Sequence, residues 1–66
     1  MNYEQAKAVA VHKMTLLKST YPELRREATV EHVVRVLVVQ GVDEGIARGI
    51  AIEAWPEVWM RTPLQK

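Results

Sequence analysis

The stretch Val30-Glu31-His32-Val33-Val34-Arg35-Val36-Leu37-Val38-Val39-Gln40-Gly41-Val42-Asp43 decides the fold of this 66-residue chain. Six of the ten residues from 30 to 39 are valine, and a glycine then interrupts the run. Gly41 supplies the left-handed conformation that commonly closes a helix, and Thr29 offers an N-cap before the run. The pattern predicts a helix over residues 30–40 that is apolar on nearly every side.

A β-strand over residues 33–39 is the alternative, because β-branched side chains pack well on sheets. No second segment rich in β-branched residues is present to pair with it. An isolated strand would leave its backbone groups without partners unless another chain supplied them. The capping residues on either side of the run therefore favour the helix.

An amphipathic helix is predicted before this run, over residues 3–19. Its apolar and small side chains recur near the 3.6-residue period, and Asn2 and Gln5 have the spacing of a capping box. Pro22 disfavours helical conformation in the residue before it. Residues 20–28 are therefore interpreted as a charged connector.

A third helix is predicted over residues 44–54, after the glycine. Asp43 can cap it, and Pro56 is expected to end or kink it near residue 54. Gly45 and Gly49 lie four residues apart within it, at a cost of about 1 kcal/mol each relative to alanine. They form a bare face where another backbone can approach closely.

Length and composition predict a single domain over residues 1–66. A chain of this size buries only about 60% of its unfolded surface, so marginal stability is expected. Hydrophobic residues make up 48% and charged residues 26% of the chain, and cysteine is absent. The predicted fold class is all-α, a small bundle of three principal helices. A short turn over residues 57–61 and a frayed tail over residues 62–66 complete it.

The charges do not favour nucleic acid as a partner. Nine Lys and Arg residues and eight Asp and Glu residues are mixed along the chain, giving a net charge of +1. The valine-rich run is about half the roughly 20 residues that a membrane-spanning helix needs. Met1 is followed by Asn2, Tyr3 and Glu4 without a basic segment and an apolar core, so a secretory signal is not expected. We expect a cytoplasmic protein without a membrane partner.

No catalytic or metal-binding pattern is present. His12 and His32 are twenty residues apart without further ligands at metal-binding spacing, and neither a nucleotide-binding loop nor a nucleophile motif occurs. We therefore expect a protein that is not an enzyme, with no cofactor, metal or small-molecule ligand.

Residues 33–51 resemble the first two helices of a ubiquitin-associated (UBA-like) domain. In that family a leucine stands four residues before a glycine, an apolar residue follows the glycine, and an alanine comes six residues after it. The matching residues are Leu37, Gly41, Val42 and Ala47, with Val34 one turn earlier. The resemblance implies a compact helical hairpin with a tendency to bind proteins.

The binding loop of UBA-like domains usually carries methionine before the glycine and an aromatic residue after it. This chain has Gln40 and Val42 at those positions, so ubiquitin binding is not carried over. The helix over residues 3–19 is also additional to the family pattern.

The leading functional hypothesis is a protein-protein interaction module that forms a homodimer through the valine-rich helix. That helix has more apolar circumference than two neighbouring helices can cover. Bare glycines and a C-terminal apolar cluster add to the expected contact surface. The predicted interface residues are Val33, Val36, Leu37, Val39, Gly45, Gly49, Val58, Trp59 and Met60.

Two alternatives use other surfaces. In the first, Val58, Trp59 and Met60 anchor the chain to a different protein, as in an adaptor or a host-directed inhibitor of the phage or mobile-element type. Trp55 is expected to be buried and Trp59 at least partly available to a partner. In the second, the glycine turn belongs to a DNA-binding helix-turn-helix. Arg48 is the only cation in the helix that would read the bases, which disfavours this second alternative.

Overall fold

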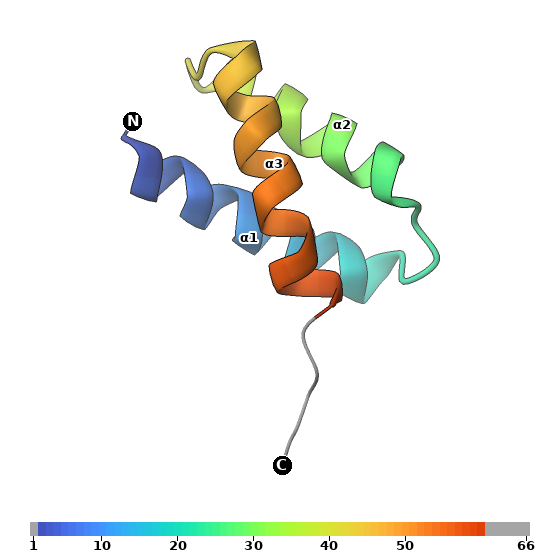
Figure 1. Cartoon of the computed structure of the whole chain (residues 1–66). Coiled ribbons are helices and arrows are strands. Elements are labelled where there is room, and N and C mark those ends of the chain that lie inside the picture. Colours follow the sequence, from blue (N-terminus) through green and yellow to red (C-terminus); the bar gives the residue numbers. More distant parts are fainter. Residues whose placement is uncertain (1, 61–66) are drawn as a thin grey trace.

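The computed structural model describes residues 2–60, which form three α-helices and no strand (Figure 1). Helix α1 spans Tyr3–Thr20, α2 spans Arg26–Val39 and α3 spans Glu44–Trp59. The predicted all-α class is confirmed for this part of the chain. The predicted tail over residues 62–66, and Arg61 in the predicted final turn, lie outside the described residues.

The predicted capping box begins α1. The Asn2 side-chain oxygen accepts a hydrogen bond from the Gln5 amide at 2.8 Å, and the Gln5 side chain accepts one from the Asn2 amide at 3.0 Å. Two amides at the start of the helix, which lack carbonyl partners within it, are thereby satisfied. Helix α1 buries Ala6, Ala10 and Met14 along one side.

Helix α2 begins four residues earlier than predicted, so Thr29 is not an N-cap. Thr29 lies inside the helix, is fully buried, and donates its hydroxyl hydrogen to the Arg25 carbonyl oxygen at 2.8 Å. This bond to the preceding turn satisfies the hydroxyl, which lets a buried threonine continue the helix. The predicted connector over residues 20–28 shrinks to residues 21–25.

Gly41 has the predicted left-handed backbone, with a φ of 97°. The Val42 amide donates to the Leu37 carbonyl oxygen at 3.0 Å, and the Gly41 amide donates to Val38 at 2.9 Å. These bonds form a Schellman motif, which ends α2 sharply. The Asp43 carboxylate then accepts from the amides of Gly45 and Ile46 at 3.0 and 3.2 Å and caps α3.

Helix α3 runs through Pro56 to Trp59, so the prediction that it ends near residue 54 is wrong. Pro56 is exposed, and water can therefore bond the Ile52 carbonyl oxygen that loses its amide donor. The Met60 amide bonds the Pro56 carbonyl oxygen at 3.0 Å and closes the last turn. Packing of Val58 beyond the proline compensates for the missing bond, because its side chain is buried in the core.

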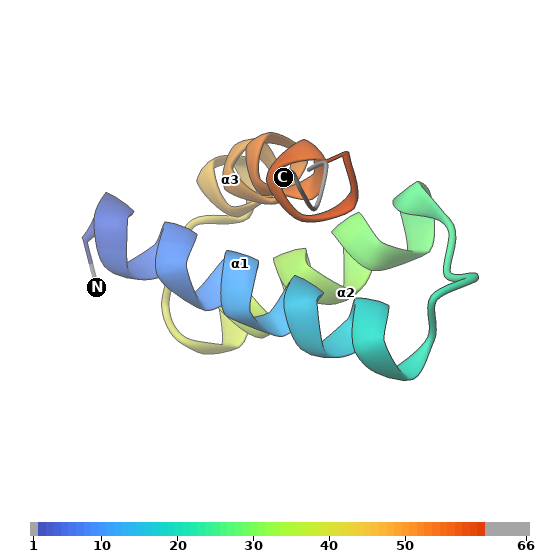
Figure 2. The same ribbon diagram turned by 90° about the horizontal axis from the view of Figure 1, so that it is seen from below.

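Helix α3 lies across a layer formed by α1 and α2 (Figure 2). It packs against both helices more extensively than they pack against each other. The core fills the space between this layer and α3, and its buried apolar residues come from all three helices. They are Ala6, Ala10, Met14, Val30, Val33, Val34, Leu37, Ala47, Ile50, Ala51, Ala54 and Val58.

Candidate protein-binding surface on helix α3

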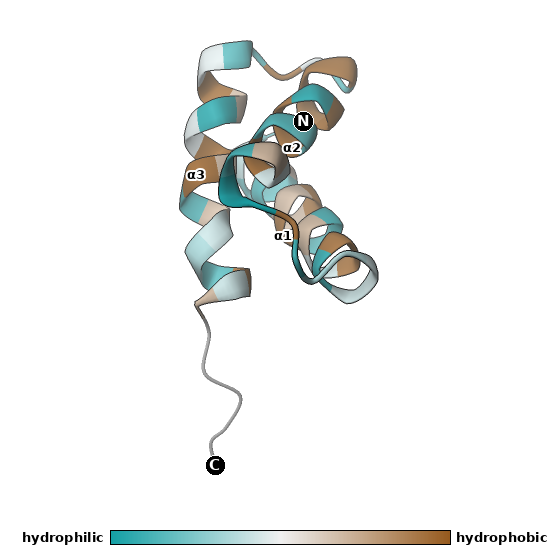
Figure 3. Cartoon of the chain, turned by 90° about the vertical axis from the view of Figure 1, so that its right-hand side faces the viewer, coloured by the Kyte–Doolittle hydropathy of each residue, from teal (hydrophilic) through white to brown (hydrophobic). Residues whose placement is uncertain are grey.

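Helix α3 has an apolar face turned to the core and an uncharged face turned away from it. The inner face consists of Ala47, Ile50, Ala51, Ala54 and Val58, all buried. Steps of three and four residues keep these side chains on one side of the helix. In Figure 3 the opposite side of α3 is not covered by another helix.

We define the outer stripe of α3 as Gly45, Gly49, Ile52, Pro56 and Trp59. The steps between these residues are four, three, four and three, the spacing of the apolar seam in a coiled coil. None of them carries a charge. Ile52 is 43% exposed, Trp59 is half-buried, and the other three are exposed. Met60, which is 67% exposed, adjoins the C-terminal end of the stripe.

Among residues 2–60, no packing contact requires a glycine at position 49. A Cβ atom added to it would meet nothing within 4 Å, and its φ is not positive. At Gly45 an added Cβ would meet only the Asp43 side chain, at 3.2 Å. Glycine costs about 1 kcal/mol relative to alanine in a helix interior. What the two glycines provide is bare backbone on the outer stripe, which a second helix can approach closely.

Two tryptophans form the bulky C-terminal end of this surface. The Trp55 and Trp59 rings are stacked, with centroids 5.9 Å apart and planes inclined by 4°. The Arg26 guanidinium lies 5.5 Å from the centroid of Trp55, a cation–π contact that fixes α2 to α3. Both tryptophans are half-buried, so the expectation that Trp55 is buried and Trp59 partly available holds only for Trp59.

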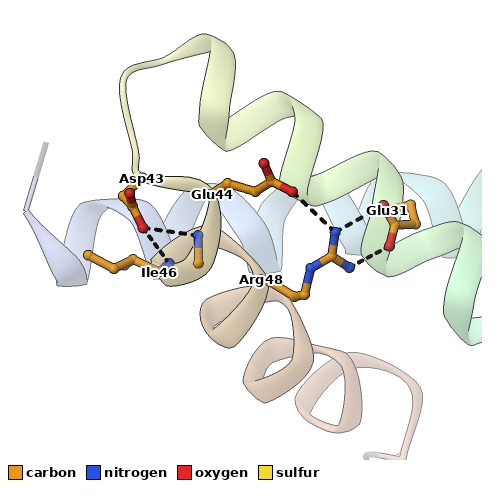
Figure 4. A network of polar contacts seen from close by, with 6 residues as sticks. Glu31, Asp43, Glu44, Ile46 and Arg48 are labelled. Carbon is orange, nitrogen blue, oxygen red and sulfur yellow. Dashed lines mark hydrogen bonds and ion pairs between the residues drawn. The ribbon is translucent and has the colours of Figure 1, made fainter.

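A row of charges borders the outer stripe on the α2 side. The Arg48 guanidinium pairs with both carboxylate oxygens of Glu31, its Nη2 atom 3.3 Å from Oε1, and lies 3.7 Å from Glu44 (Figure 4). The hydrogen bond from Arg48 lowers the pKa of the Glu31 carboxyl below its ordinary value. Arg48 is therefore engaged within the chain.

A second row borders the stripe on the α1 side. The Lys7 ammonium lies 3.2 Å from Glu53 and 2.6 Å from Glu57, and the Tyr3 hydroxyl donates to Glu53. The hydrogen bonds that Tyr3 and Lys7 donate to Glu53 lower the pKa of its carboxyl. The bonds that Lys7 donates to Glu57 and Glu53 raise the pKa of its ammonium. The outer stripe is thus an uncharged strip between two rows of paired charges, the arrangement that flanks the seam of helix pairs.

One face of the valine-rich helix is buried by its own chain. Val33 and Leu37 are fully buried, so their assignment to an interface is wrong. Helix α2 turns them to the core because α3 and α1 pack on that side. Val36 is half-buried and Val39 is 81% exposed, and both face away from the core. Together with Val38, which is 40% exposed, they leave a short apolar area near the C-terminal end of α2.

The remaining predicted interface residues also fall into two groups, one buried and one on the outer stripe. Val58 is buried against the core, and its prediction as a surface anchor is wrong. Gly45, Gly49 and Trp59 lie together on the outer stripe. Ile52 and Pro56 were not among the predicted interface residues. Alternating steps of four and three residues, continued from Gly45 and Gly49, reach both of them. They were missed because Pro56 was expected to end the helix.

An apolar depression, separate from the outer stripe, lies beside the turn between α2 and α3. It has a volume of about 430 Å³, and Tyr3, Ala6, Val42, Ile46 and Ile50 line most of it. Ile46 is 58% exposed and Tyr3 53% exposed. This depression includes the residue that follows the glycine in the UBA-like pattern, but Val42 offers no aromatic anchor there.

Comparison with protein-family models, with curated proteins and with solved structures gives no match for this chain. The UBA-like resemblance thus stays a prediction. Within residues 2–60, no group of three or more His, Asp or Glu side chains is placed to hold a metal ion. None of the described helices combines the length and apolarity needed to cross a membrane.

Proposed function

We propose that this chain is a small protein-protein interaction module whose contact surface is the outer stripe of α3. The observation that carries the proposal is the uncharged, heptad-spaced stripe on a helix whose opposite face is already buried. The inner face of α3 packs against α1 and α2, whereas within residues 2–60 no helix covers its uncharged outer stripe.

The outer stripe replaces the valine-rich helix as the proposed contact surface. Helix α2 turns Val33 and Leu37 inward, and Val36, Val38 and Val39 leave a short apolar area near its C-terminal end. The stripe on α3 runs the length of a 16-residue helix and ends in a tryptophan. Tryptophan is enriched among the residues that dominate binding energy at interfaces.

No observation favours DNA binding by the second helix of the hairpin. Arg48 is paired with Glu31 and Glu44, and the other charged residues of α3 are Glu53 and Glu57. A phosphate backbone would meet a surface of acidic side chains there.

Site-specific photo-cross-linking in cells that make the protein tests the proposal. A benzoylphenylalanine in place of Met60, at the end of the stripe, is expected to give a covalent adduct with a protein. The same group in place of Val39, on the outer side of α2, is the matched control and should give none. Ile52→Lys should remove the adduct formed from position 60. Absence of any adduct from position 60 overturns the proposal.

A further inference from the structure

We draw no further inference here: the strongest candidate, the apolar depression of about 430 Å³ that Tyr3, Val42 and Ile46 line beside the turn between α2 and α3, carries none, because nothing in the described residues 2–60 shows what covers it.

Discussion

The Lys18 ammonium donates a hydrogen bond to the Val58 carbonyl oxygen at 3.0 Å, which joins the last turn of α1 to the last turn of α3. The final carbonyl groups of a helix lack amide donors, and a cation there also complements the helix dipole. The bond thus helps α3 to continue past Pro56.

Removal of this bond should loosen the end of α3. Lys18→Met keeps the aliphatic part of the side chain and removes the donor, and we expect a loss of about 1 kcal/mol in the free energy of unfolding. Urea denaturation followed by circular dichroism measures it. Lys13→Met, in the same helix, is the control and should change stability little. Equal stability of the Lys18 variant and the natural chain would contradict the assigned role.

Alanine at two of the glycines should have opposite effects. Gly41→Ala places a Cβ on a residue with a φ of 97°, so a loss of about 1 kcal/mol or more is expected. Gly49→Ala adds a Cβ that meets nothing within 4 Å in an α-helix, so a gain of up to about 1 kcal/mol is expected. Thermal unfolding at low protein concentration, where self-association does not contribute, measures both changes. A loss of stability for Gly49→Ala would show that its glycine is needed within the single chain.

The two sides of α2 should respond differently to truncation. Val33→Ala leaves a cavity in the core, for which we expect a loss of about 2 kcal/mol. Val39→Ala removes a side chain that is 81% exposed and should change stability by less than about 0.5 kcal/mol. Chemical denaturation of both variants provides the comparison. Similar losses for the two would mean that α2 is rotated from the orientation described.

Acid should weaken the fold through the ion pairs that border the outer stripe. The pKa values of Glu31 and Glu53 are lowered in the folded chain from the ordinary 4.5, so the unfolded chain binds protons more readily. The stability that these groups contribute is fully present above about pH 4.5 and is lost as the pH falls through the lowered values. Melting temperatures measured from pH 7 to pH 2 should fall less steeply for Glu53→Gln than for the natural chain. Parallel curves would contradict this linkage.

Predictions from local sequence were accurate where the deciding contacts lie within a few residues. The capping box at Asn2 and Gln5, the left-handed Gly41 and the cap at Asp43 all depend on atoms no more than five residues away. Thr29 and Pro56 were assigned wrongly because local preference alone makes one a cap and the other a terminator. A bond to the Arg25 carbonyl oxygen and the packing of Val58 against the core override these preferences.

By itself, the sequence determined that residues 2–60 form three helices, with Asn2, Gly41 and Asp43 at their ends. Only the tertiary structure decided which helix keeps an uncovered apolar face. Helical periodicity places side chains around an axis, but it does not state which side meets another helix. Because α3 lies across α1 and α2, the valines at 33 and 34 turn inward and the stripe from Gly45 to Trp59 remains outside.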